Sequence, residues 1–272
     1  MKKRNLIVSI LLILSAVILS SCGGTENDEN ILRVGMEANY APFNWSQSDN
    51  SNGAVEIEKS KEFAAGYDVT IAKKVAESLG KKLVVVKTEW DGLIPALTSG
   101  KIDLIMAGMS PTADRAESID FSSDYYNSDL VIVTLDDNPY SNSNKLSDFE
   151  GAKITAQLST FHYTVIDQIP GVIKESAMDN FSAMRVALES GVIDGYITER
   201  PEAESAIKVL SNFKLIELED GFETSREDTS IAVGIKKGSD LTEKINGVLD
   251  SISEEERTKI MEDAKENQPS NN

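Results

Sequence analysis

The chain has 272 residues, of which 40% are hydrophobic, so it is long enough for one large or two medium domains and too apolar to be intrinsically disordered. Its formal net charge of −18 at pH 7 argues against binding to nucleic acids or to anionic lipid surfaces, because both attract basic proteins. With a single cysteine, the chain cannot form an intramolecular disulfide.

The N-terminal residues have the pattern of a secretory signal peptide. Lys2, Lys3 and Arg4 form a positively charged start, and the apolar run from Leu6 to Leu19 is short for a membrane span. We therefore predict a signal peptide over residues 1–21. Its removal takes away three positive charges and changes the formal net charge from −18 to −21.

The cysteine lies directly after this predicted signal peptide. Cys22 follows Leu19-Ser20-Ser21 and precedes two glycines, an arrangement that resembles the lipobox of bacterial lipoproteins. The resemblance implies cleavage before Cys22 and attachment of a diacylglyceryl group to its sulfur; the alternative is a free thiol in an exported chain. Residues 22–30 are then the lipidated cysteine and a flexible, polar tether. The expected location is extracytoplasmic, with a lipid anchor in the cell membrane.

The first folded elements are expected from residue 31 onward. A strand is predicted over residues 31–35, followed by a loop over residues 36–45 in which Pro42 opposes sheet pairing. The Ser- and Asn-rich residues 46–62 are expected to be a surface excursion.

A helix and a second strand follow this excursion. The apolar spacing predicts a helix over residues 68–79, with Asp68 as its N-cap and Gly80 at its end. Residues 83–86 are predicted to be a buried strand. The alternation of strand and helix up to Met106 is typical of βαβ units in a parallel sheet.

The segment from residue 89 to residue 126 has a pattern that indicates an anion site. A helix ends at Gly100, a buried strand over residues 102–106 ends at Ser110, and Thr112 is the expected N-cap of the next helix. Arg115 occupies the third helical position, where a cation opposes the helix dipole. A small carboxylate bound at this helix start would account for it. The alternative is a surface arginine paired with a neighbouring acidic residue.

The second half of the chain repeats the first. The segment 96–103, a helix end followed by a glycine and a strand start, returns as residues 187–194. We therefore predict an α/β protein of two similar lobes, each with a mostly parallel sheet flanked by helices. Because ligands bind beyond the carboxyl ends of parallel strands, a ligand cleft is expected between the lobes.

The expected division of the mature chain follows from these elements. The predicted parts are the first part of lobe 1 (31–135), lobe 2 (136–228), a return to lobe 1 with C-terminal helices (229–266) and a disordered tail (267–272).

No enzyme motif is recognisable in the sequence. His162 is the only histidine, and the sequence contains no Cys/His cluster, G-x-G-x-x-G motif or P-loop. We expect His162 to be a polar residue of the cleft or of the surface rather than a catalytic base. No cofactor and no metal are predicted.

Several motifs spread over residues 31–260 become specific when they are taken together. In chain order they are Leu32-x-Val34-Gly35, Tyr40-x-Pro42-Phe43, Gly66-Tyr67-Asp68-Val69, Trp90-x-x-Leu93-Ile94-Pro95-Ala96-Leu97, Gly108-Met109-Ser110-x-Thr112-x-x-Arg115, Phe121-Ser122 and Asp194-Gly195-Tyr196-Ile197-x-Glu199. They resemble the polar amino-acid-binding proteins of bacterial ABC importers (solute-binding protein family 3), which include the histidine-, glutamine- and lysine/arginine/ornithine-binding proteins.

This resemblance implies a site for both charges of an amino acid. Arg115 would bind the ligand α-carboxylate and Glu199 the α-ammonium. The residues implied to assist them are Gly108, Met109, Ser110, Thr112, Ser159 and Thr160.

For the ligand side chain, the resemblance implies that Tyr40 and Trp90 sandwich it and that Glu37 reaches toward its tip, with Phe161 and His162 at the same end. Core packing of the two rings and solvent exposure of Glu37 are the alternatives. Aromatic faces attract cations, and a carboxylate at the tip penalises acidic ligands. A basic amino acid or histidine is therefore favoured, with glutamine next.

The predicted protein is a monomeric substrate-binding lipoprotein that hands a free L-amino acid to an ABC permease and its ATPase, and it is not an enzyme. Two alternatives share the scaffold. One is a cyclohexadienyl dehydratase-like enzyme, and the other is an amino-acid sensor domain that signals to a partner.

Overall fold

The computed structural model describes residues 30–269. The predicted signal peptide, Cys22, nearly all of the tether and residues 270–272 lie outside this range. The described residues from Leu32 onward form one compact unit. Within the described range, no helix has both the length and the apolar character needed to cross a bilayer.

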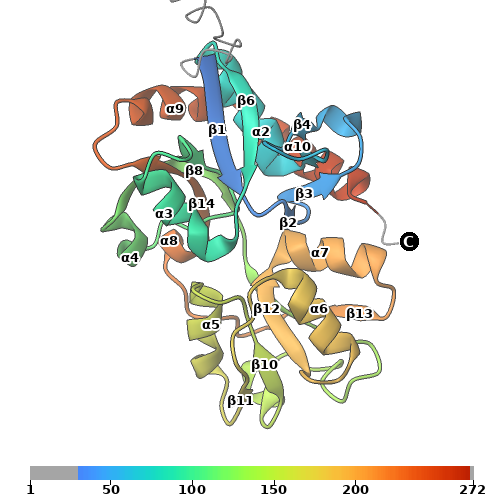
Figure 1. Cartoon of the computed structure of the whole chain (residues 1–272). Coiled ribbons are helices and arrows are strands. Elements are labelled where there is room, and N and C mark those ends of the chain that lie inside the picture. The colour runs from blue at the N-terminus through green and yellow to red at the C-terminus, as the bar shows by residue number, and fades with distance from the viewer. Residues whose placement is uncertain (1–29, 270–272) are drawn as a thin grey trace, which may run out of the picture. The chain divides into compact units, whose positions relative to one another are not determined.

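The first lobe is built on a five-stranded sheet in the order β6-β1-β7-β14-β8 (Figure 1). Its strands are β1 (Ile31–Met36), β6 (Lys82–Lys87), β7 (Leu104–Ile105), β8 (Ile119–Asn127) and β14 (Ser230–Lys236). β1 and β7 are parallel, whereas β14 runs antiparallel to β7 and to β8. The pairing of β14 shows that the chain returns to the first lobe after residue 229.

The second lobe contains a sheet of the same design, in the order β11-β10-β12-β9-β13. Its strands are β9 (Leu130–Leu135), β10 (Lys153–Thr155), β11 (Ile173–Lys174), β12 (Gly195–Glu199) and β13 (Phe213–Ile216). β10 is parallel to both of its neighbours, and β9 is antiparallel to β12 and β13. The chain therefore enters the second lobe before β9, and not after residue 135 as expected. The apolar run of β9 fits either sheet, and only its pairing partners decide.

A small antiparallel sheet, β2-β3-β5-β4, lies where a loop and a surface excursion were expected. Its strands are β2 (Asn39–Tyr40), β3 (Asn44–Gln47), β4 (Val55–Glu56) and β5 (Phe63–Ala65). The expectation that residues 36–62 lack sheet pairing is therefore wrong. Pro42 lies in the turn between β2 and β3, where its nitrogen needs no ladder hydrogen bond. A bridge from Ile57 to Val85 joins this sheet to the first lobe.

Helices pack against both large sheets (Figure 1). Those against the first sheet are α2 (Tyr67–Ser78), α3 (Leu93–Thr98), α4 (Ala113–Ala116), α8 (Arg226–Thr229) and α9 (Leu241–Asp250). Those against the second are α5 (Phe161–Val165), α6 (Phe181–Glu189) and α7 (Arg200–Val209). The last helix, α10 (Glu254–Asn267), packs on α2 and α7, so Asn267 belongs to a helix and not to the expected tail.

Asp68 has a different role from the predicted one. α2 begins at Tyr67 with Gly66 as its N-cap, so Asp68 lies inside the first turn. Its carboxylate is buried and accepts hydrogen bonds from the Tyr125 hydroxyl at 2.6 Å and from the Asn44 side-chain amide at 2.8 Å. Asp68 therefore joins α2 to β8 and β3 instead of capping the helix.

The internal repeat extends to matching hydrogen bonds in the two lobes. Gly100 follows α3 with φ 77°, and Gly191 follows α6 with φ 70°, conformations that favour glycine. Asp103 accepts a backbone N–H of β1 at 2.8 Å, and Asp194 accepts a backbone N–H of β10 at 2.9 Å. Each repeat thus uses an aspartate to tie the start of a strand segment to the neighbouring parallel strand.

Candidate functional site

One small cavity is lined by residues from both lobes. Those of the first lobe are Tyr40, Trp90, Gly108, Ser110 and Arg115, and those of the second are Gln157, Thr160, Phe161, His162 and Glu199. The cavity volume is ≈ 10 Å³, which is about the space of one water molecule. Eight of these ten residues were predicted from the sequence to bind the ligand, and His162 was expected near the end of its side chain. Gln157 is the lining residue that was not predicted.

The remaining predicted residues lie around this cavity. Thr112 and Ser159 line a wider depression of ≈ 550 Å³ that shares Arg115, Thr160 and Phe161 with the cavity. Met109 is buried in the core of the first lobe, and its carbonyl accepts the backbone N–H of Ala232 in β14 at 3.0 Å. The side chain of Met109 therefore supports the loop and does not face the cavity.

Arg115 reaches from the short helix α4 to the loop of the second lobe. One guanidinium nitrogen donates to the carbonyl oxygen of Ser110 at 2.9 Å, and the other donates to that of Ser159 at 3.1 Å. Ser159 has φ 57°, a left-handed conformation that costs a non-glycine residue roughly 1–2 kcal/mol. Burial lowers the pKa of Arg115 to about 10, against the opposing effect of Glu199, so Arg115 stays positively charged at pH 7.

Trp90, in the 3-10 helix η3 (Trp90–Gly92), packs beside Arg115. The guanidinium carbon lies over the indole ring, 5.0 Å from its centre, within the range of a cation–π interaction. The indole N–H donates to the same Ser159 carbonyl oxygen in a long bond of 3.5 Å. One face of Trp90 is therefore occupied by a residue of the protein.

Glu199, at the end of β12, is buried between side chains of both lobes. One carboxylate oxygen accepts the hydroxyl of Tyr40 from the first lobe, and the other lies 3.2 Å from Nε2 of His162 in its own lobe. Burial by itself raises the pKa of Glu199, but His162 and Tyr40 outweigh it and lower the pKa below its ordinary value. Glu199 is therefore a buried carboxylate that is ionised at neutral pH.

Tyr40 has both faces of its ring covered. It stacks on Phe43 at a centroid distance of 5.0 Å and on Phe181 at 4.5 Å. Burial and the adjacent Glu199 raise the pKa of the hydroxyl well above its usual value, so the hydroxyl stays a donor. The resemblance implied that Tyr40 stacks on the ligand side chain. In the structure, Tyr40 instead offers the cavity its hydroxyl and a ring edge, and it has no free ring face. Phe181 of α6 was not identified from the sequence.

Gly108 allows Tyr40 to approach the loop after β7. Its φ is 62°, and a Cβ at this position would lie 2.6 Å from Cε1 of Tyr40. The backbone N–H of Gly108 also bonds to the buried carboxylate of Asp68. Burial raises the pKa of Asp68 to about 7, although its three hydrogen bonds act in the opposite direction. Asp68 thus supports the cavity from behind.

Glu37 lies behind the cavity lining, in contact with Gln157. The amide of Gln157 donates to both carboxylate oxygens of Glu37 at 3.2 Å and to the carbonyl of Asp179 at 3.1 Å. Glu37 is buried, which rules out the solvent-exposed alternative. Burial raises the pKa of Glu37 to about 7; the Gln157 amide opposes this shift, and Glu89 and Asp91 add to it. Gln157, which follows β10, was not predicted from the sequence as a site residue.

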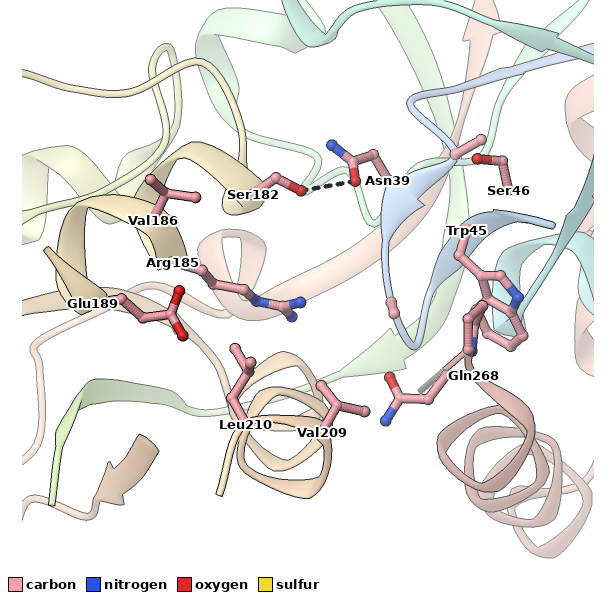
Figure 2. Close-up of a pocket in the computed structure, with 13 residues that line it drawn as sticks. Asn39, Trp45, Ser46, Ser182, Arg185, Val186, Glu189, Val209, Leu210 and Gln268 are labelled. Carbon is pink, nitrogen blue, oxygen red and sulfur yellow. Dashed lines mark hydrogen bonds between the residues drawn. The ribbon is translucent and has the colours of Figure 1, made fainter. Parts of the chain in front are cut away.

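A second pocket, of ≈ 290 Å³, lies between the β2–β3 turn and helices α6 and α7 (Figure 2). Arg185 points into it, but its guanidinium is bonded to the buried Glu202 at 2.7 Å and 3.2 Å. At the edge of the pocket, Ser182 donates to Asn39 at 3.0 Å. No predicted site residue lines this pocket. In the part of the chain that the structure describes, no group of three His, Cys, Asp or Glu residues is arranged to hold a metal ion.

Comparison with known proteins identifies a related family. The family described as bacterial extracellular solute-binding proteins, family 3, matches residues 32–264. The chain is 30% identical over 210 residues to a probable histidine-binding protein of Campylobacter jejuni, with 74% of this chain and 76% of that protein covered. It is 28% identical over 266 residues to the arginine-binding extracellular protein ArtP of Bacillus subtilis, with 90% and 92% covered.

The fold is also similar to solved structures. One is the amino acid ABC transporter substrate-binding protein AbpA from Streptococcus pneumoniae bound to L-arginine, with a TM-score of 0.75 and 26% sequence identity. The similarity covers 88% of this chain and 95% of that protein.

Proposed function

The chain belongs to the bacterial extracellular solute-binding proteins of family 3, and on this basis we propose that it captures a free amino acid with a basic side chain and delivers it to the permease of an ABC importer. Its activity is solute binding, as in the family and in the arginine-binding relative, and this sets the enzyme alternative aside.

The observation that carries the proposal is the pair of opposite charges in one cavity. Arg115 comes from the first lobe and Glu199 from the second, and both line the same space. A zwitterionic amino acid has a carboxylate for the arginine and an ammonium for the glutamate. Glu199 is buried and Arg115 is half-buried, so each would form a charge-assisted hydrogen bond with the ligand in a site that is largely shielded from water.

Entry of the ligand requires the lobes to separate. A cavity of ≈ 10 Å³ holds no amino acid, and contacts between the lobes close it. Arg115 and Trp90 bond to Ser159, Tyr40 bonds to Glu199, and Gln157 bonds to Glu37. Contacts from the ligand to each lobe then replace these direct contacts between the lobes. The bound ligand favours a closed form in which it bridges the lobes. The depression lined by Thr112 and Ser159 is the proposed entrance.

The preference for a basic ligand rests on the acidic surroundings of Gln157. Glu37 lies directly behind its amide, and the charges of Glu89 and Asp91 act on Glu37. A cationic ligand side chain at this end would relieve the repulsion among three carboxylates, whereas an acidic side chain would add a fourth. Histidine-binding and arginine-binding relatives agree with this preference. Glutamine is the second choice, because its amide can donate to a carboxylate and accept from the Gln157 amide.

We further propose that the mature protein is a monomer held at the outer face of the cell membrane by a lipid on Cys22. The sequence Leu19-Ser20-Ser21-Cys22 after a signal peptide supports the anchor. The anchor keeps the protein near its permease and ATPase partners, and the tether of residues 23–30 lets the folded part reach them.

A thermal-shift screen with the twenty amino acids, ornithine and cystine tests the proposal. A ligand at 100 times its Kd adds about 2.7 kcal/mol to the free energy of unfolding, which a shift of the melting temperature detects. Arginine, lysine, ornithine or histidine should give the largest shift. If no amino acid raises the melting temperature, or if glutamate raises it most, the proposed function or its ligand preference is wrong.

A further inference from the structure

His162 is a buried titratable residue of the cavity that the proposed zwitterion clamp does not use. It is the second residue of α5, it is 4% exposed, and its ring packs on that of Phe161 at a centroid distance of 4.4 Å. Nε2 lies 3.2 Å from a carboxylate oxygen of Glu199. Neither ring nitrogen has a hydrogen bond of good geometry within residues 30–269. The imidazole can therefore accept a proton without losing an existing hydrogen bond.

The pairing of His162 with Glu199 does not depend on closure of the lobes. Both residues belong to the second lobe, where α5 packs against β12. The other partner of Glu199, Tyr40, comes from the first lobe and separates when the lobes open. In an open protein, His162 is thus the neighbour that stays beside the carboxylate which the ligand ammonium must reach.

The charges of the cavity balance only when His162 is neutral. With Arg115 positive and Glu199 negative, a neutral imidazole leaves the lining uncharged, and a zwitterion adds no net charge. A protonated imidazole already offsets the negative charge of Glu199 before the ligand binds. It also places a second cation beside the ligand ammonium, and repulsion between these like charges in a buried site weakens binding. We propose that His162 makes amino-acid binding depend on pH, so that the protein binds tightly when His162 is neutral and releases its ligand when His162 is protonated.

A test of this proposal must distinguish the titration of His162 from that of the other titratable groups around the cavity. Glu199, Tyr40 and Arg115 are the titratable side chains that line the cavity with it. Tyr40 and Arg115 keep their protons at neutral pH, because the pKa of Tyr40 is raised well above its usual value and that of Arg115 is about 10. Glu37, behind Gln157, has a pKa of about 7 and changes charge in the same pH range as an ordinary histidine.

Because His162 is the only histidine, NMR of the imidazole in untagged protein reports on it without assignment. The titration is followed from pH 5 to pH 7.5 without ligand and with saturating L-arginine, whose guanidinium and carboxylate do not titrate in this range. This experiment rests on the proposed amino-acid binding. We expect L-arginine to move the midpoint of the imidazole titration to lower pH by about one unit, which corresponds to a tenfold linkage between proton and ligand.

Calorimetry supplies the matching affinity. In the wild type, the Kd for L-arginine should be roughly tenfold weaker at pH 5.5 than at pH 8.0, and His162→Gln and His162→Asn should lose most of this difference. Glu37→Gln is the control, since it removes a group that titrates in the same range, as does the buried Asp68, and it should keep the ligand-induced shift of the imidazole signal. Thermal melts verify that the variants are folded.

The outcomes separate the inference from the proposed function. Binding of L-arginine with an unchanged imidazole midpoint, or with the full pH dependence retained in both His162 variants, would overturn the inference alone. Absence of amino-acid binding by the wild type at pH 8.0 would overturn the proposed function and this inference with it.

Discussion

Arg115 and Trp90 contact each other and donate to the same acceptor, the carbonyl oxygen of Ser159 in the opposite lobe. The cation lies on the indole face of a half-buried pair, an arrangement that contributes about 0.5–2 kcal/mol. In the proposed binding mode, a ligand carboxylate takes the place of the Ser159 carbonyl as partner of Arg115. Closure of the lobes with and without ligand would then use the same N–H groups of Arg115.

The clamp is tested by removing each charge separately. Arg115→Ala and Glu199→Gln should each weaken L-arginine binding by about 2–5 kcal/mol, because each leaves one charge of the ligand buried without a partner. Isothermal titration calorimetry measures the loss. Arg226→Ala removes an exposed arginine that pairs with Asp124 and should change the affinity little. Unchanged binding in both cavity variants would show that the amino acid binds elsewhere.

Glu37 is expected to set the preference for basic ligands. Glu37→Gln keeps an acceptor for the Gln157 amide but removes the charge, so L-arginine and L-lysine should lose more affinity than L-glutamine does. Competition binding with the three amino acids gives the ratio. Equal losses for all three would place the ligand side chain away from Glu37.

The same residue should make stability depend on pH. In the folded protein the pKa of Glu37 is raised to about 7, so between about pH 4.5 and pH 7 the folded state holds more protons than the unfolded state. The free energy of unfolding must then fall as pH rises through this window, by at most about 3 kcal/mol for this group.

Urea unfolding at pH 5 and pH 8 should show a smaller fall in Glu37→Gln than in the wild type. Asp68, whose pKa is also about 7, accounts for part of the remainder, and the exposed Glu77→Gln is the control. An equal fall in wild type and Glu37→Gln would contradict the raised pKa of this buried carboxylate.

Gly108 should tolerate no side chain. Gly108→Ala places a methyl group against the Tyr40 ring at a left-handed backbone position and should cost about 1–3 kcal/mol of stability, with weaker binding because Tyr40 must move. Gly100 has φ 77°, and a Cβ added there would have no atom within 4 Å, so Gly100→Ala reports the backbone strain alone. Unfolding and calorimetry of the two variants measure the difference. Identical behaviour of the two would mean that contact with Tyr40 is unimportant.

Cys22→Ala should abolish the lipid anchor. The variant should no longer incorporate labelled lipid, and it should move from the membrane fraction to the soluble fraction, because the sulfur of Cys22 is the proposed attachment atom. Fractionation and metabolic labelling in a bacterial host test this. Lipid labelling that persists in the variant would remove the lipoprotein interpretation.

Local sequence was sufficient for the family, the fold class and most of the cavity lining. The motif around Arg115 and the repeat that ends at Glu199 each lie within one helix–strand unit, where spacing, glycine ends and apolar runs carry the information. The match to solute-binding family 3 confirms the family predicted from those motifs. Because the loop that leads to Arg115 and the strand that ends at Glu199 belong to equivalent units of the repeat, the sequence by itself predicts that the two charges converge.

The partners of these side chains required the tertiary structure. Tyr40 meets Glu199 across 159 residues of sequence, and Gln157 meets Glu37 across 120. Periodicity relates a residue only to neighbours a few positions away, so it could not show that Phe43 and Phe181 cover the Tyr40 ring, nor that His162 lies beside Glu199. It could not assign β9 to a sheet either, because an apolar strand fits both. These contacts join residues that are far apart in the sequence, so they depend on how the strands pair and how the two lobes pack. Only the tertiary structure determines them.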